Sequence, residues 1–164
     1  DLSRTQRIVM TKLAVIGGGS TYTPELIDGV LSRRDRLPIT EIALCDIDQE
    51  RLDIVAGFAR RMVSAAGGGI EIHTTTSQAE AVRGADFVVS QFRVGQQAAR
   101  HRDELLGREF GLIGQETVGV GGFAKGLRTI PVALALADTI LDEAPHAILL
   151  NFTNPAGKIG RAHV

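Results

Sequence analysis

Three consecutive glycines, Gly17 to Gly19, stand between an apolar run and the expected start of a helix. The run, residues 12–16, is continuous and therefore typical of a buried parallel strand. Thr23 is expected to cap the helix, and Pro24 to occupy its first position. A glycine turn that leads from a strand into a helix lets the backbone approach a ligand closely. The free amide groups at the helix start then attract an anion.

This turn suits a pyrophosphate, and two hydroxyl groups beside it can donate further hydrogen bonds. Where a third glycine often stands, the sequence has a proline and a glutamate instead. A plain strand-to-helix turn is therefore the alternative. We interpret the segment as a cofactor-binding loop made of Gly17, Gly18, Gly19, Ser20 and Thr21.

Asp46 follows the second expected strand, residues 39–45. A carboxylate at that place accepts both ribose hydroxyls of an adenosine and favours NAD over NADP. The alternative is that Asp46 caps the next helix, although Asp48 is better placed for that role. Cys45 is expected to be a small core residue. The sequence therefore predicts NAD as the cofactor.

Strands and helices alternate along the chain, as in a doubly wound parallel sheet. We expect an α/β fold with a mainly parallel sheet, a Rossmann-type NAD-binding domain of the lactate and malate dehydrogenase kind. A glycine-rich loop is predicted over residues 111–126, with Pro131 in the first turn of the helix after it. The predicted strands are residues 12–16, 39–45, 70–75, 86–92 and 147–152, and the predicted helices are 23–33, 48–65, 96–109 and 128–144, with a short helix beginning at Ser77.

Composition excludes several classes of protein. With 164 residues, 44% of them hydrophobic and 23% charged, the chain is long enough for one domain with a sizeable core. A net charge of −1 argues against a nucleic-acid-binding surface. No apolar run reaches the roughly 20 residues of a membrane helix, so no membrane partner is expected. The single cysteine excludes an internal disulfide and a cysteine-rich zinc site, and fits a cytoplasmic location.

Both ends of the chain are expected to be non-native. The first strong strand follows Met10, which we interpret as the start, so residues 1–9 are expected to be upstream or disordered sequence; a native extension is the alternative. The last six residues are what ATC GGA AGA GCA CAC GTC encodes, a stretch of a common sequencing adapter. We therefore expect residues 158–164 to be a non-native tail, residues 10–157 to form the Rossmann domain, and the gene to continue beyond Gly157.

Five short motifs follow one another along the chain. They are GGGSTYTPEL at residues 17–26, QFRVG at 91–95, IGQET at 113–117 with three glycines soon after it, LRTIP at 127–131, and NFTNPAG at 151–157. This series resembles glycoside hydrolase family 4, and in particular its 6-phospho-β-glucosidase branch. Gln96 and residues 107–110 depart from the family pattern, which leaves the exact substrate preference open.

The resemblance implies a glycosidase that hydrolyses 6-phospho-β-glucosides with NAD and a divalent metal, usually manganese. NAD-dependent enzymes of this kind are an exception to the paired-carboxylate scheme. In the family, hydride leaves C3 of the sugar for NAD, a tyrosine removes the C2 proton, and the glycosidic oxygen is eliminated. Water then adds and the hydride returns. Phosphorylated disaccharides or aryl glucosides are the implied substrates, and a homo-oligomer is the implied assembly of the full-length protein.

The resemblance also implies substrate contacts at two predicted strand ends. Arg93 is expected to bind the 6-phosphate, since open α/β sheets bind ligands at that edge and a guanidinium fork suits a phosphate. Asn154 is expected to contact sugar hydroxyls near the nicotinamide. The alternatives are an exposed arginine at a helix start and a turn-forming asparagine before proline. Gln115, Glu116 and Thr117 are expected to line the cleft.

No catalytic and no metal-binding residue is expected in this chain. The family's metal-binding cysteine and histidine and its base tyrosine come after the Asn-Pro motif, and the only tyrosine here is Tyr22, in the glycine loop. We therefore expect an N-terminal NAD-binding part, truncated before the catalytic half and inactive alone. The charged side chains at residues 100–104 are expected to form a solvated helix face.

Two other functions remain open. A 2-hydroxy-acid dehydrogenase of the lactate or malate type shares the fold, the acid after the second strand and an Asn-Pro after a later strand. The Gly-Gly-Gly-Ser and Gln-Glu-Thr motifs favour the glycosidase. An NAD-sensing binding module is the non-enzymatic alternative, a complete domain that needs no downstream residues.

Overall fold

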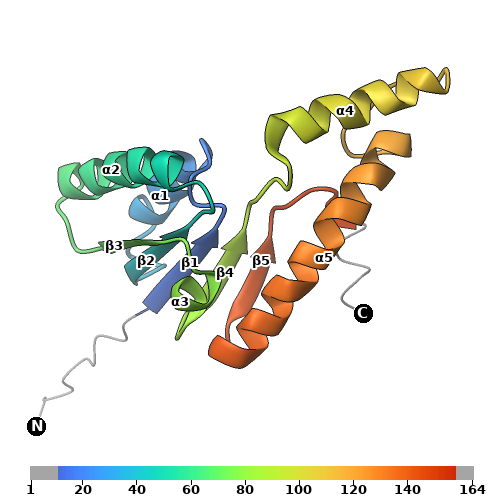
Figure 1. Ribbon diagram of the computed structural model, residues 1–164. Helices are drawn as coiled ribbons and strands as arrows, with labels where there is room; N and C mark the ends of the chain where they lie inside the picture. Colours follow the sequence, from blue (N-terminus) through green and yellow to red (C-terminus); the bar gives the residue numbers. More distant parts are fainter. Residues whose placement is uncertain (1–10, 158–164) are drawn as a thin grey trace, which may run out of the picture.

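The computed structural model describes residues 11–157, so the expectations for residues 1–9 and 158–164 lie outside the described residues. The strands form one parallel sheet in the order β3-β2-β1-β4-β5 (Figure 1). They are β1 (Thr11–Ile16), β2 (Ile39–Cys45), β3 (Glu71–Thr75), β4 (Phe87–Ser90) and β5 (Ile148–Asn151). The predicted α/β fold with a parallel sheet is confirmed.

Helices cover both faces of this sheet (Figure 1). α1 (Thr23–Leu31) and α2 (Gln49–Ala65) pack on one face, and α3 (Gln78–Val82) and the C-terminal part of α5 (Gly119–Glu143) pack on the other. α4 (Gln96–Glu109) extends beyond the carboxyl ends of the strands and packs against α5. The strand order grows outward from β1 in both directions, so a switch point falls between β1 and β4.

Alternate residues of the central strand contribute to two separate cores, because successive side chains of a strand point to opposite faces. In β1, Leu13 and Val15 face α1 and α2, while Ala14 and Ile16 face α3 and α5. Leu136 of α5 is 1% exposed in the second core. Burial of one such leucine stabilises the fold by roughly 1.5–3 kcal/mol. These two cores fix β1, and with it the loop that begins at its carboxyl end.

The start of α5 differs from the prediction. The helix begins at Gly119 rather than at Arg128, so the loop predicted over residues 111–126 is wrong in its second half. Pro131 accordingly lies inside the helix and not in its first turn. The high glycine content of the segment was the reason for the loop prediction, because glycine is unfavourable in a helix by about 0.8–1 kcal/mol relative to alanine.

Close packing explains why a helix contains so many glycines. Gly121 and Gly122 are buried in α5. A Cβ atom on Gly121 would overlap the backbone carbonyl of Gln115, and one on Gly122 would overlap the backbone of Thr117. The connection between α4 and α5 therefore lies directly on the helix start, and only residues without a side chain allow that approach.

With its early start, α5 has 25 residues and is long and apolar enough to cross a membrane, the one helix of this kind within residues 11–157. The expectation from the sequence rested on unbroken apolar runs, and α5 contains Lys125 and Arg128. Leu136 and Ile140 of this helix are buried against the sheet. Length and composition do not distinguish a core helix from a spanning one, and the packing places the C-terminal part of α5 against the core of the sheet.

Candidate functional site

The glycine loop lies where β1 ends, between the carboxyl ends of β2 and β4. The amides of Gly17 and Gly18 both donate to the carbonyl of Cys45, at 2.9 and 2.8 Å. Gly17 has a φ of +93°, and a Cβ atom there would lie 2.8 Å from the nitrogen of Phe92. The backbone thus passes tightly between two strand ends, which only glycine permits. In an open α/β sheet this crevice is where ligands bind.

The helix α1 follows the loop directly, which places the positive end of a nine-residue helix beside it. Its N-cap is Tyr22, so the expectation that Thr23 is the cap is wrong. The hydroxyl of Thr23 donates instead to the Gly18 carbonyl at 2.8 Å, inside the protein. Ser20 is partly buried and Thr21 is exposed, so both hydroxyl groups stay accessible to a ligand at the loop.

Asp46 closes the loop on the side of β2. Its Oδ2 accepts from the Gly19 amide at 2.9 Å, and its Oδ1 accepts from the Asp48 amide at 3.1 Å. Asp48 is the residue that caps α2, because its carboxylate accepts from the Arg51 amide at 3.1 Å. The alternative role of Asp46 as the cap is therefore excluded. Its carboxylate lies at the glycine loop.

Cys45, just before this carboxylate, is a core residue with 4% of its surface exposed. Burial raises the pKa of its thiol to about 11, and the negative charges of Asp46 and Glu80 act in the same direction. A protonated, buried thiol is a poor nucleophile at neutral pH. Among residues 11–157, moreover, no group of three His, Cys, Asp or Glu side chains could hold a metal ion.

Arg93 lies beyond β4, and its guanidinium pairs with the carboxylate of Glu116. Lys125 reaches the same carboxylate oxygen at 2.6 Å, and Arg100 reaches the other oxygen at 3.1 Å. Burial raises the pKa of the Glu116 carboxyl, but hydrogen bonds from Lys125 and Arg93 outweigh it, so the pKa is lowered. We name Arg93, Arg100 and Lys125, together with the Glu116 carboxylate that they share, the cation cluster. Of the three residues expected to line the cleft, Glu116 is the one that the structure joins to Arg93.

A second ion pair joins α4 and α5, the two helices that carry Arg100 and Lys125 of this cluster. Asp103 of α4 is 5% exposed, and both of its oxygens accept from Arg128 of α5, at 2.7 and 3.2 Å. Arg128 also donates to the Val94 carbonyl at 2.9 Å. The expected solvated face at residues 100–104 is therefore wrong for Asp103. Its spacing of four from the buried Ala99 was the signal that it shares the inner face of α4.

The remaining expected residues lie at the same edge of the sheet or near it. Asn154 follows β5, is exposed, and precedes Pro155 through a cis peptide bond. Just before it, Asn151 accepts from the hydroxyl of Ser90 at 2.7 Å, which ties β5 to β4. Gln115 and Thr117 belong to the connection between α4 and α5; Gln115 is exposed and Thr117 is partly buried.

Sequence reasoning missed two residues of this region. Gln91 donates from its side chain to the Gly17 carbonyl at 3.2 Å and to the Thr23 hydroxyl at 2.8 Å. Lys125 is 5% exposed, and the sequence gives no sign of this burial because its segment has the glycine content of a loop. A single glutamine after a strand carries no signal of its own, so no local pattern could have revealed the first of these.

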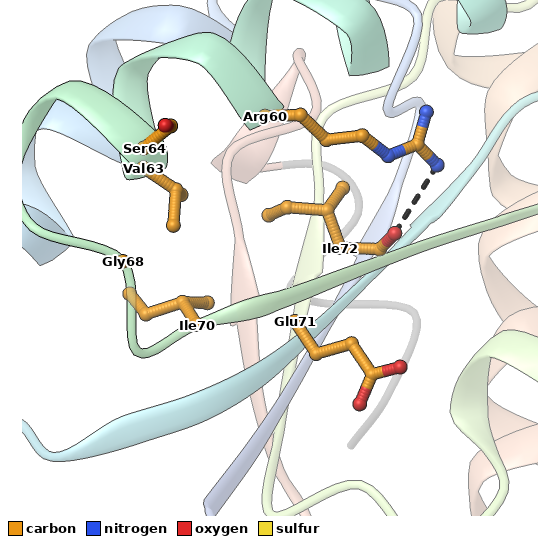
Figure 2. A pocket seen from close by; sticks show the side chains of 7 residues that line it. All are labelled: Arg60, Val63, Ser64, Gly68, Ile70, Glu71 and Ile72. Atoms are coloured by element: carbon orange, nitrogen blue, oxygen red, sulfur yellow. Dashed lines mark hydrogen bonds between the residues drawn. The ribbon is translucent and has the colours of Figure 1, made fainter.

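A shallow hollow at the β3 edge of the sheet contains no residue of the glycine loop or of the cation cluster. It lies between α2 and β3 and includes Arg60, Val63 and Glu71 among its lining residues (Figure 2). The guanidinium of Arg60 is directed to the backbone carbonyl of Ile72, to which it donates at 3.1 Å. The hollow is beside the edge strand rather than at the glycine loop, and we assign it no role.

Comparison with known proteins shows which family the chain resembles. The sequence pattern of the family described as Family 4 glycosyl hydrolase matches residues 12–164. A probable 6-phospho-beta-glucosidase of Bacillus subtilis is 52% identical over 153 residues, which cover 92% of this chain and 35% of that protein. The 6-phospho-beta-glucosidase of Escherichia coli is 44% identical over 153 residues, covering 92% of this chain and 34% of that protein. The chain thus spans only about a third of the length of these relatives.

Solved structures give the same result. The 6-phospho-beta glucosidase of Thermotoga maritima with NAD and glucose-6-phosphate matches with a TM-score of 0.85 and 41% identity, over 90% of this chain and 35% of that one. Lactate dehydrogenase from Eimeria maxima and malate dehydrogenase from Plasmodium falciparum match with TM-scores of 0.58 and 0.60 at 16% identity, which confirms the dehydrogenase-like fold and no more. The family pattern covers nearly the whole chain, and we conclude that the chain belongs to family 4 of the glycosyl hydrolases.

Proposed function

We propose that this chain is the NAD-binding part of a glycosidase that hydrolyses 6-phospho-β-glucosides. The observation that carries the proposal is the glycine loop with the Asp46 carboxylate held against it, at the switch point of the sheet. The names of the Bacillus subtilis and Escherichia coli relatives support the substrate class. Since the chain spans about a third of those proteins, the activity is proposed for a protein of their length.

The residues present fit a dinucleotide. The three glycines let the loop pass close to its neighbours, because Cβ atoms on Gly17, Gly18 and Gly19 would approach neighbouring atoms to 2.8, 2.9 and 2.9 Å. The start of α1 supplies a positive end for the pyrophosphate. Asp46 exchanges its amide donors for ribose hydroxyls when the cofactor binds. Its charge repels the 2′-phosphate of NADP, so NAD is the proposed form.

The cation cluster is the proposed phosphate site. The guanidinium of Arg93 already binds one anionic group, the Glu116 carboxylate, which supports a role in binding a second. Glu116 remains held by Lys125 and Arg100 when Arg93 turns to a phosphate. Asn154, at the end of β5, is proposed to contact the sugar hydroxyls, and Gln115 and Thr117 to line the cleft beside them.

When bound, NAD supplies a hydride acceptor and donor beside the sugar. The residues of this chain bind the cofactor, hold the substrate phosphate and fix the distance between the two sites. Manganese is proposed only for the longer protein, since the described residues contain no group of His, Cys, Asp and Glu able to hold it. We assign no catalytic residue within the described part of this chain.

The proposed partners follow from the same site. Phosphorylated disaccharides or aryl glucosides are the substrates, and no nucleic acid or membrane is proposed. A homo-oligomer is proposed for the protein of full length. A cytoplasmic location is proposed because a free, buried cysteine suits a reducing interior.

Titration calorimetry of this chain with NAD and with NADP tests the proposal. We expect NAD to bind more tightly than NADP, and glucose 6-phosphate to bind more tightly than glucose. Equal affinity for NAD and NADP would show that Asp46 does not meet the ribose. For a protein of the relatives' length, sustained NADH release from malate or lactate would favour a dehydrogenase instead.

A further inference from the structure

Gln91 is the first residue after β4, and its side chain reaches the glycine loop. Its Nε2 donates to the Gly17 carbonyl at 3.2 Å and to the Thr23 hydroxyl at 2.8 Å. Thr23, at the start of α1, is fully buried, and its hydroxyl donates a hydrogen bond to the Gly18 carbonyl at 2.8 Å. These contacts join the ends of β1, β4 and α1 through two side chains. We name Gln91 and Thr23 the loop brace.

Chemistry fixes the direction of every hydrogen bond in the loop brace. A carbonyl oxygen only accepts, so the carboxamide of Gln91 must present its NH₂ group to Gly17. The single proton of Thr23 goes to Gly18, so its oxygen accepts the second proton of that NH₂ group. A glutamate of the same shape would set a carboxylate against a carbonyl oxygen. The contacts therefore need a neutral double donor at position 91.

The opposite side of the loop is held by backbone. The amides of Gly17 and Gly18 both donate to the Cys45 carbonyl, at 2.9 and 2.8 Å. With their amides held by β2 and their carbonyls by the loop brace, these two residues are fixed on both sides. The next amide, of Gly19, donates at 2.9 Å to the side chain of Asp46, a contact that a ligand can replace. The fixed part of the loop thus ends where the ligand-binding part begins.

We propose that Gln91 is a positioning residue for NAD, whose carboxamide fixes the orientation of the loop peptides before any ligand arrives. The inference rests on the proposed NAD site. A loop that is already ordered loses less conformational entropy on binding, so the loop brace raises affinity without touching the cofactor. Arg93 of the cation cluster follows two residues later, so the same short segment fixes the cofactor loop and carries the phosphate-binding arginine.

The test measures NAD affinity by titration calorimetry in this chain, together with urea unfolding in the absence of NAD. Loss of this partly buried donor through Gln91→Met should weaken NAD binding roughly tenfold. Gln91→Glu should weaken it further, because it adds a repulsive charge. Thr23→Val should resemble Gln91→Met, whereas Thr23→Ser keeps the hydroxyl and should bind as the unaltered chain does. Gln97→Glu, on the exposed side of α4, is the matched control and should change nothing.

A double variant shows whether Gln91 and Thr23 form one hydrogen-bond network or make two independent contacts. In Gln91→Met with Thr23→Val, the total loss of NAD affinity should be close to the larger single loss, because both changes break the same network. If the Gln91 variants unfold at lower urea but bind NAD with unchanged affinity, the loop brace is structural only and the inference is wrong. If Gln91→Glu does not fold, the methionine and Thr23 variants decide alone. Asp46→Ala is measured beside them: unchanged NAD binding in that variant overturns the proposed function, whereas unchanged binding in the Gln91 variants alone overturns only this inference.

Discussion

The amide of Gly19 donates to the carboxylate of Asp46 at 2.9 Å, so the acid after β2 is in direct contact with the loop after β1. The two residues are 27 positions apart and meet because β1 and β2 are parallel neighbours in register. A Cβ atom on residue 19 would lie 2.9 Å from Oδ2 of this carboxylate. The carboxylate and the bare backbone therefore form one surface on which a ribose and a pyrophosphate can lie together.

Replacing Asp46 by Ala should weaken NAD binding by roughly 1.5–3 kcal/mol, the usual contribution of a hydrogen bond to a charged group. The same variant should discriminate less between NAD and NADP, because the repulsive charge is gone. Titration calorimetry with both cofactors checks the two effects.

Asp48→Ala is the control for Asp46→Ala. It removes the cap of α2 and should lower the free energy of unfolding by about 1 kcal/mol while NAD affinity stays the same. If both variants lose NAD affinity equally, the effect of Asp46 comes from a damaged loop and not from a ribose contact.

Local patterns predict the first half of this fold well. The apolar run before Gly17 and the acid-rich helix start at Asp48 each have a single local explanation, and the structure has both. The start of α5 could not be predicted in this way. Gly121 and Gly122 are there because the backbone before the helix lies against them, and that contact is tertiary.

In the candidate site, too, some features follow from local sequence patterns and others depend on tertiary packing. The loop and Asp46 were predictable because strand ends of a parallel sheet share one edge. The contact of Arg93 with Glu116 was not, since it depends on how α4 and α5 pack beyond that edge. Asp103 was expected to be solvated because charged residues usually are, yet Arg128 pairs with it inside the protein.

Arg93 should govern the binding of phosphorylated sugars in particular. Arg93→Ala should reduce affinity for glucose 6-phosphate far more than affinity for NAD, and Arg93→Lys should restore part of it, since lysine keeps the charge but not the fork. Arg102→Ala, on the exposed face of α4, is the control. Equal losses for glucose 6-phosphate and glucose would remove the phosphate role.

Glu116 should make the chain sensitive to acid. Because the folded state lowers the pKa of this carboxyl, the unfolded state takes up the proton first as the pH falls below the ordinary value of about 4.5. The stability that the carboxylate contributes is therefore present at neutral pH and is lost in acid. Urea unfolding is measured from pH 7 to pH 3. The difference in the free energy of unfolding between the unaltered chain and Glu116→Gln should become smaller as the pH falls. A difference of constant size would contradict this prediction.

Cys45 should be unreactive while the chain is folded. Its thiol is buried, with a pKa raised to about 11, so Ellman's reagent at pH 8 should react only after guanidinium chloride is added. Because the unfolded thiol ionises near 9.0, stability should also fall as the pH rises from there towards 11. The Cys45→Ala variant should not show this fall in stability at alkaline pH. Rapid labelling of the native chain would show that the strand end opens.

The free edge of β5 should make this chain associate with itself. Within residues 11–157, β5 has one neighbour in the sheet, β4, and its Ile148 and Leu150 are 55% and 43% exposed, with Phe152 after them at 66%. An apolar edge strand with unpaired backbone groups readily pairs with another chain. Sedimentation velocity over a range of concentrations should therefore show species larger than the monomer.

A charge on this edge should reverse the association. Leu150→Lys places an ammonium group where a second strand would pack, and should shift the chain towards the monomer. Ile54→Lys makes a similar change at a residue of α2 that is 67% exposed, far from the edge, and should leave the association as it is. If both variants act alike, the association is general and not directed by β5. A chain that stays monomeric at every concentration before any substitution would show that the exposed strand does not recruit a partner.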